Sequence, residues 1–282
     1  MSLHRWATVR FFRMLNDKPE ALRRMLSLYI ASESRGEISP LTVLSRYLPE
    51  CSLREMVRQH LVDEGRHLRL LRRRLEEVGG GLFPIPRPLE LQEYHFRKDG
   101  NLNEVLGLTS GEALTTDLII EILLFASVLE EFVVSRMAAH AEAACDVDPR
   151  TYFMLMDIVV DELRHSTYTQ EQAYLLAGPE RLDFAIQTHR RLREELARFA
   201  AFQFRLIFDH LLTREVVKLG RLEYAGWRAA SRVQERLGVQ VISPMARPHP
   251  ELLVTRPYPY GMAGRPVSST LTGSLSGGES GA

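Results

Sequence analysis

Apolar residues recur along most of this chain at intervals of three and four, the spacing that places side chains on one face of an α-helix. One such face, in a helix expected over about residues 17–36, carries Leu22, Leu26, Tyr29 and Glu33. Short stretches rich in proline and glycine separate the periodic segments. The pattern therefore predicts an all-α protein.

Capping and turn residues mark where the predicted helices begin and end. Ser52 and Glu55 have the spacing of a capping box, in which two side chains satisfy free backbone N–H groups. Thr109 and Glu112 have the same spacing, and Asp148 precedes a proline suited to a first helical turn. We expect helices over about residues 3–15, 17–36, 52–79, 109–144, 149–178, 180–212 and 214–238.

These helices are expected to form one domain, over residues 1–240. Two helical hairpins joined by a long crossover, residues 79–109, would make a four-helix bundle over residues 17–178. An N-terminal helix and accessory helices over residues 180–238 would be added to it. Residues 241–282 are rich in proline, glycine and serine and are expected to be an extended, partly disordered tail.

One hexapeptide occurs twice, as VDEGRH from residue 62 and as VDELRH from residue 160. Glu33 precedes Glu64 of the first copy by 31 residues. Glu131 precedes Glu162 of the second copy by the same 31 residues, and a proline lies near the middle of each interval. In antiparallel hairpins with arms of equal length, this spacing brings both residues of each pair to the same height.

The chemistry of the repeat follows from its place on a helix. Glutamate and histidine three positions apart share one face, so each motif would interrupt an apolar stripe that faces the core. Burying an ionised carboxylate without a cation costs on the order of several kcal/mol. Two divalent metal ions would balance the charge, because carboxylates can bridge them and each imidazole can supply one nitrogen.

The aspartates of the two motifs strengthen this expectation. Asp63 and Asp161 directly precede the motif glutamates, and each can reach the histidine of the opposite hairpin and accept its second N–H. Such a bond fixes the histidine tautomer and raises its basicity. Both aspartates are therefore expected to support cofactor binding.

The pattern resembles that of the ferritin-like dimetal-carboxylate superfamily, in which Glu, E-x-x-H, Glu and E-x-x-H occur on four successive helices. The resemblance covers about residues 17–178 and implies six metal ligands: Glu33, Glu64, His67, Glu131, Glu162 and His165. It also implies that Glu64 and Glu162 bridge two iron ions. Glu33 and Glu131 would each be a terminal ligand.

Two of the expected ligands, Glu131 and Glu33, have a second glutamate close by in the sequence. Glu130 could replace Glu131, but the 31-residue spacing and the small serines one turn away favour Glu131. Many oxygenases of the superfamily carry a hydroxyl residue one turn after this glutamate, and the resemblance makes Ser135 its catalytic counterpart. Glu37 could replace Glu33, but it follows a glycine and breaks the spacing.

Other residues capable of redox or metal chemistry are expected to have structural roles. His60, His189 and His210 join no second motif, so we do not expect them to bind metal. Tyr29 and Tyr168 lie one turn from expected ligands, where packing is the favoured interpretation over redox activity.

The resemblance implies an enzyme that uses two iron ions, or manganese with iron, to activate O2 and oxidise or oxygenate a small organic substrate. An external electron donor would be needed. Two alternatives share the ligand pattern: a dimanganese catalase that dismutates peroxide, and a ferroxidase or iron-binding protein. The chain length and the additional helices argue against a minimal iron-storage cage.

Composition narrows the cellular setting. The 36 basic and 36 acidic residues cancel, which does not favour nucleic acid as a partner. The sequence has no membrane-length apolar run and no secretory signal, and its two cysteines suit a reducing cytoplasm. One aromatic helix is expected to pack on the bundle or form a homodimer interface through Phe199, Phe202, Phe204 and Phe208.

Overall fold

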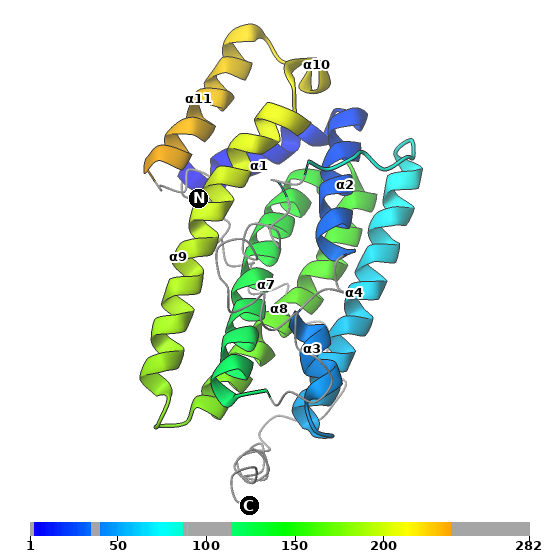
Figure 1. The fold of residues 1–282 in the computed structure, drawn as a ribbon. Coiled ribbons are helices and arrows are strands. Elements are labelled where there is room, and N and C mark those ends of the chain that lie inside the picture. Colours follow the sequence, from blue (N-terminus) through cyan, green and yellow to red (C-terminus); the bar gives the residue numbers. More distant parts are fainter. Residues whose placement is uncertain (1–2, 35–39, 87–88, 90–113, 238–282) are drawn as a thin grey trace, which may run out of the picture.

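The computed structural model describes residues 3–34, 40–86, 89 and 114–237. Within these ranges every regular element is a helix and no strand is present, which confirms the predicted all-α class. The elements in Figure 1 are α1 (Leu3–Asn16), α2 (Pro19–Glu33), α3 (Pro40–Tyr47), α4 (Ser52–Glu77), α7 (Thr116–Ala144), α8 (Pro149–Ala177), α9 (Leu182–Leu206), the π-helical turn η3 (Ile207–Leu211), α10 (Arg214–Val217) and α11 (Arg221–Leu237).

Several helix ends follow directly from the local sequence. Pro19 and Pro149 occupy the first turns of α2 and α8, where no backbone N–H is needed. The Asp148 side chain accepts a hydrogen bond from the N–H of Thr151 and so caps α8. After α4, three successive glycines adopt positive φ angles, which terminate the helix.

One predicted cap and two predicted boundaries need correction. The capping box at Ser52 is wrong, because Cys51 is the N-cap of α4 and makes no side-chain cap bond. Helix α7 begins at Thr116, capped by the Thr115 hydroxyl, and the predicted start at Thr109 lies outside the described residues. The last predicted helix is split into α10 and α11, because Lys218 takes a left-handed conformation. The predicted crossover and tail also lie largely or wholly outside the described residues.

Helices α2, α4, α7 and α8 run beside one another, as Figure 1 shows. The most extensive contact joins α7 and α8, while α4 packs on both α2 and α8. Arg74, near the end of α4, donates to the Asp148 cap of α8 at 2.8 Å, so these two helices run in opposite directions. Helix α1 packs on α7, and α9 covers α7 and α8. Among the described helices, none is both long and apolar enough to cross a membrane.

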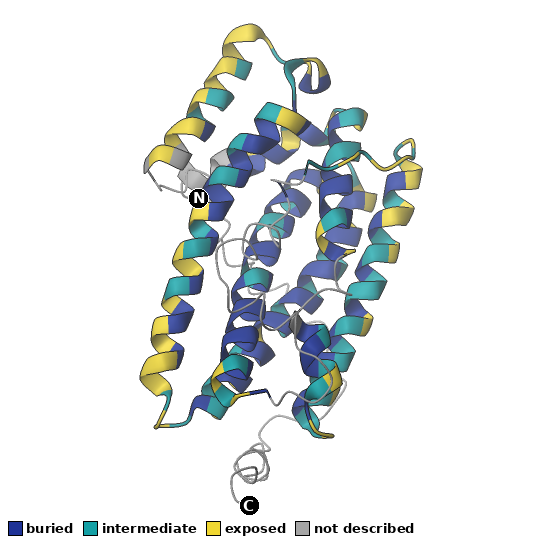
Figure 2. Cartoon of the chain, in the orientation of Figure 1, coloured by how far each residue is buried: buried dark blue, intermediate teal, exposed yellow. Residues whose placement is uncertain are grey.

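A layer of polar side chains divides the apolar interior into two clusters. Along α4, Val57 belongs to one cluster and Leu71 to the other. Along α8, Ile158 and Ala173 are divided in the same way. Both copies of the repeated motif lie between these positions. Figure 2 shows α7 and α8 as mostly buried and α4 as mostly intermediate. Buried ionisable groups are costly unless they are paired, so this layer marks a candidate site.

Candidate metal centre

The repeated motifs place their glutamates and histidines opposite one another in the polar layer. Glu64 and His67 lie on α4, Glu162 and His165 lie on α8, and Glu33 is the last residue of α2. His67, Glu162 and His165 are at most 1% exposed, and Glu33 is 7% exposed. Five of the six residues predicted as metal ligands therefore meet in one buried place.

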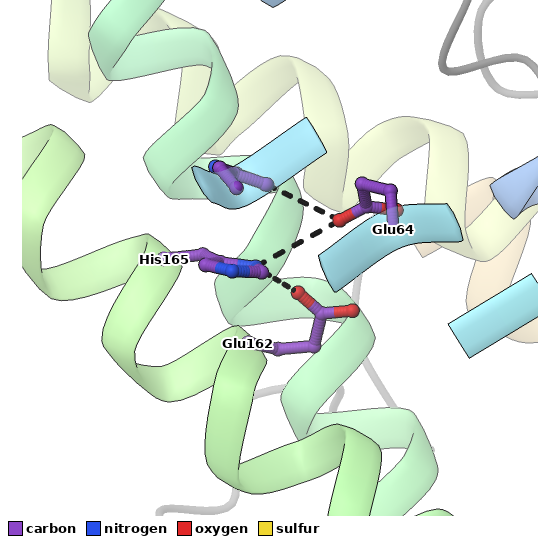
Figure 3. Close-up of side chains that lie close together, drawn as sticks. Glu64, Glu162 and His165 are labelled. Carbon is purple, nitrogen blue, oxygen red and sulfur yellow. Dashed lines mark hydrogen bonds and ion pairs between the residues drawn. The ribbon is translucent and has the colours of Figure 1, made fainter. Parts of the chain in front are cut away.

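Glu162 lies between the two motif histidines. One of its oxygens, Oε1, is 3.0 Å from His67 Nδ1, and the other, Oε2, is 2.8 Å from His165 Nδ1. Glu64 approaches from α4, with Oε1 3.7 Å from His165 Nδ1, as Figure 3 shows. Glu33 Oε2 lies 3.9 Å from His67 Nδ1. A carboxylate with one oxygen facing each histidine has the arrangement needed to bridge two cations.

Two sets of donor atoms are compact enough to hold a metal ion, and they share two glutamates. In each set the donor atoms lie within 4.8 Å of one another. The common members are Glu64 and Glu162. The first set adds His60 and His165, and the second adds Glu33 and His67.

Unsatisfied polar atoms provide a test of whether these residues fit metal ions. Buried atoms that lack a hydrogen-bond partner include Glu33 Oε2, His60 Nε2, Glu64 Oε1, His67 Nδ1 and Glu162 Oε1. Nearly all buried polar atoms in folded proteins have such a partner. All five are oxygen or imidazole nitrogen donors, and they converge on one volume. Carboxylate oxygens and imidazole nitrogens are ligands of divalent metal ions, so the donor set could hold such ions.

The ionisation of the glutamates leads to the same conclusion. Burial, followed by repulsion from Glu64, raises the pKa of Glu33 well above its ordinary value. Burial and then repulsion from Glu162 and Glu64 do the same for the pKa of Glu130. Burial also opposes ionisation of Glu162, but the charge of His67 and the hydrogen bond from His165 outweigh it and lower that pKa. The four carboxylates therefore need additional positive charge to be ionised together.

His60 belongs to the site, contrary to the expectation from sequence. It lies one turn before Glu64 on α4 and is 1% exposed. Its Nε2 is 3.2 Å from Glu64 Oε1 and 3.5 Å from Glu130 Oε1. The sequence signal was its spacing, because residues 60, 64 and 67 share one helix face. His60 is not the histidine of a Glu-x-x-His pair, so the motif alone does not identify it.

On α7 the structure brings Glu130, rather than Glu131, to the cluster. Glu130 is 7% exposed and approaches His60, as described above. The side chain of Glu131 is 24% exposed and pairs with Arg193 of α9 at 3.2 Å. The glutamate beside the cluster is therefore not the one that the equal 31-residue spacing favours. Helix α2 ends at Glu33 and α3 follows as a separate helix, so the two hairpins do not have matching arms.

The placement of Ser135 changes with that of the glutamate. Ser135 is buried one turn after Glu131, on the face of α7 that Glu131 occupies. The hydroxyl nearest Glu130 along the same face is that of Ser127, three residues earlier, which donates to the backbone carbonyl of Ser166 at 3.0 Å. Ser135 therefore shares a helix face with Glu131 rather than with Glu130.

The two motif aspartates make the crosswise contacts that the sequence predicts. Asp161 Oδ2 lies 3.3 Å from His67 Nε2, and Asp63 Oδ2 lies 3.3 Å from His165 Nε2. Burial alone lowers the pKa of His67, but the Glu162 charge and the bond to Asp161 raise it to about 10. Each aspartate holds the outer ring nitrogen, so the inner nitrogen of each histidine is directed at the carboxylates.

The arginines of the repeat hold these aspartates in place. Arg66 on α4 pairs with Asp161 and, at 2.5 Å, with Asp157. Arg164 on α8 pairs with Asp63 at 2.6 Å and with Asp161 at 3.0 Å. Burial opposes ionisation of Asp161, but its bond to His67 and the two arginines lower its pKa. Asp, Glu, Arg and His of each copy therefore all have a place at the site or next to it.

The two tyrosines singled out in the sequence differ in position. The Tyr168 hydroxyl lies 2.9 Å from His60 Nδ1, so it adjoins the site. The Tyr29 hydroxyl instead lies 3.0 Å from His140 Nδ1, and the other nitrogen of His140 is 2.9 Å from Asn16 Oδ1. Tyr29 is thus part of a separate buried hydrogen-bond chain.

Comparisons with known proteins identified no relative of the chain. No family model matches the chain, and no curated protein or solved structure matches it either. The assignment of a function therefore depends on the residues and geometry of this site.

Proposed function

We propose that the chain is a ferritin-like four-helix protein that binds two divalent metal ions and activates O2 to oxidise or oxygenate a small organic substrate. The observation that carries the proposal is the convergence of five buried, unpartnered donor atoms from α2, α4 and α8. Two donor sets sharing Glu64 and Glu162 support a pair of ions rather than one. Iron is the proposed metal, and manganese with iron or two manganese ions are the alternatives.

Charge balance supports two ions. Glu33, Glu64, Glu130 and Glu162 contribute four negative charges when ionised, which two divalent ions neutralise. The aspartates behind the histidines are already neutralised by Arg66 and Arg164. Metal binding would therefore balance the charge of the four glutamates in the layer.

The residues of the chain have distinct roles in this proposal. Glu64 and Glu162 hold both ions, and Asp63 and Asp161 orient the motif histidines. When bound, a reduced metal pair supplies the electrons and the binding position for O2. Buried apolar residues on both sides of the polar layer, such as Val57 and Leu71 of α4, would exclude bulk water from the site. An apolar surround suits a small apolar substrate.

Metal analysis tests the proposal. Protein produced with iron and manganese supplied together is expected to contain about two ions per chain. The Glu162→Gln variant is expected to lose most of this metal, and the Glu131→Gln variant, altered on the face toward Arg193, is expected to keep it. Equal metal content in Glu162→Gln and the unaltered protein would sink the proposal.

The reaction is tested separately on the metal-loaded protein. After anaerobic reduction, rapid mixing with O2 is expected to oxidise the iron pair with a transient absorbance change that Glu162→Gln lacks. Two manganese ions and rapid peroxide dismutation would instead support the catalase alternative. Iron oxidation that continues over many more than two ions per chain would support a ferroxidase.

A further inference from the structure

Three histidines, not two, surround the shared carboxylates. The imidazole of His60 stacks on that of His165, with ring centroids 3.6 Å apart and planes inclined by 14°. His60 Nε2 and His165 Nδ1 lie 3.2 and 3.7 Å from the same oxygen, Glu64 Oε1. His60 Nε2 also faces Glu130 at 3.5 Å. The stacking therefore directs two imidazole nitrogens, one from each histidine, at the same oxygen of Glu64.

The outer nitrogen of each of these histidines is held by an oxygen atom. His60 Nδ1 has Tyr168 at 2.9 Å, whereas the motif histidines have Asp63 and Asp161 at 3.3 Å. A histidine that binds a metal ion through one nitrogen characteristically has its other nitrogen fixed in this way. His60 therefore has the same arrangement as the two histidines that the repeated motif supplies.

His140 shows how a structural histidine differs. Both of its nitrogens have partners, the hydroxyl of Tyr29 at 3.0 Å and the side-chain oxygen of Asn16 at 2.9 Å. His60 makes a hydrogen bond through Nδ1 only, and its buried Nε2 makes none, although carboxylate oxygens lie 3.2 and 3.5 Å away. The unpartnered atom faces two carboxylates, which is where a cation would lie.

We propose that His60 is a third histidine ligand and that it makes the two metal positions inequivalent. This inference rests on the dimetal function proposed above. One position would have two imidazoles and the other would have one, with two glutamates shared. The nitrogen-rich position would comprise His60, His165 and Glu130, the other His67 and Glu33, and both would share Glu64 and Glu162.

Inequivalent ligands give inequivalent affinities. Imidazole binds the later first-row divalent ions well, whereas carboxylates suit manganese and magnesium. The position with two imidazoles is therefore expected to fill first and to hold cobalt or iron more tightly. The position with one imidazole is expected to fill second.

Anaerobic titration with cobalt(II), followed by visible absorption and calorimetry, tests this inference. The unaltered protein is expected to bind two ions in two phases. In His60→Gln the tighter phase is expected to weaken at least tenfold, while the other phase stays unchanged. His189→Gln is the matched control, because His189 also pairs with a tyrosine, Tyr174 at 2.9 Å, and has a buried unpartnered Nε2, but belongs to neither donor set. It is expected to titrate like the unaltered protein.

The outcomes separate this inference from the proposed function. A single phase in the unaltered protein, or a His60→Gln titration identical to it, contradicts the inference. If Glu162→Gln loses cobalt binding in that case, the dimetal function still holds. If Glu162→Gln also binds two ions normally, the proposed function fails as well.

A measurement on the unaltered protein removes any dependence on the folding of His60→Gln. X-ray absorption at the cobalt edge, with one equivalent of cobalt(II) bound, reports the number of imidazoles on the metal. Two imidazoles per cobalt support the inference, and one overturns it.

Discussion

Glu130 and Glu131 show how much a single residue step matters on a helix. Successive residues are rotated by about 100° around the axis, because one turn takes 3.6 residues. One carboxylate consequently enters the buried cluster, while its neighbour reaches Arg193 on α9. Sequence spacing could not decide between the two glutamates. Where a helix ends earlier than expected, the position predicted from spacing can be wrong by one residue. The packing of α7 against α8 and α9 decides it.

The first prediction uses this adjacent pair. Glu130→Gln is expected to weaken metal binding about tenfold or more, equivalent to about 1.4 kcal/mol. Glu131→Gln is expected to leave binding unchanged, because its carboxylate faces Arg193. Competition with a chromophoric chelator measures both affinities. Weaker binding in Glu131→Gln alone would return the ligand role to the residue that the sequence favoured.

The second prediction concerns the aspartate behind His67. Asp161→Asn is expected to lower metal affinity by about 10- to 100-fold, because the histidine loses the charge that orients it and raises its basicity. Asp157→Asn is the control, since Asp157 also binds Arg66. The same titration compares the two variants. Equal affinities in Asp161→Asn and Asp157→Asn would contradict the role given to Asp161.

The third prediction is a pH dependence of stability caused by His140. Burial lowers the pKa of His140 from 6.5 to about 3. Between these two pH values the unfolded chain binds a proton that the folded protein does not, so stability is lost as pH falls from about 6.5 to 3. Above pH 7 the residue contributes no pH dependence. Urea unfolding of the unaltered protein and of His140→Gln is expected to show a smaller loss in the variant over this window, and parallel curves would contradict the assignment.

At the scale of elements, the contact between the end of α4 and the start of α8 fixes the register of the two motifs. Arg74 donates to both oxygens of Asp148 and to the Thr151 hydroxyl. Because α4 and α8 run in opposite directions from this point, Glu64 and Glu162 arrive at the same level. The capping role of Asp148 was predicted from its sequence, but its link to Arg74 was not, since the pairing of distant helices leaves no local pattern.

The fourth prediction tests this link. Asp148→Ala is expected to lower the free energy of unfolding by about 1–3 kcal/mol, because it removes the α8 cap and two of the hydrogen bonds of the half-buried Arg74. Asp117→Ala removes an exposed pair with Arg181 and is expected to cost no more than about 0.5 kcal/mol. Urea unfolding measures both. A loss in Asp148→Ala no greater than in Asp117→Ala would contradict this account.

At the scale of the whole molecule, periodicity predicted the helical class and the positions of the main described helices, because each of them buries a mainly apolar face. The repeated motif predicted five residues that the structure brings together. His60 shares a helix face with the first motif, so its place could have been expected from spacing alone. The position of Glu130 could not, since it depends on how α7 is rotated about its axis. That rotation follows from the packing of all neighbouring helices together.

The central claim is that two metal ions lie between α4 and α8 and share Glu64 and Glu162. A crystal structure of the iron-loaded protein with anomalous diffraction at the iron edge tests it most directly. The account predicts two anomalous peaks about 3.5–4 Å apart, between these two carboxylates and next to the three histidines. A map with no peak at this place, or with a single peak bound away from Glu162, would contradict it.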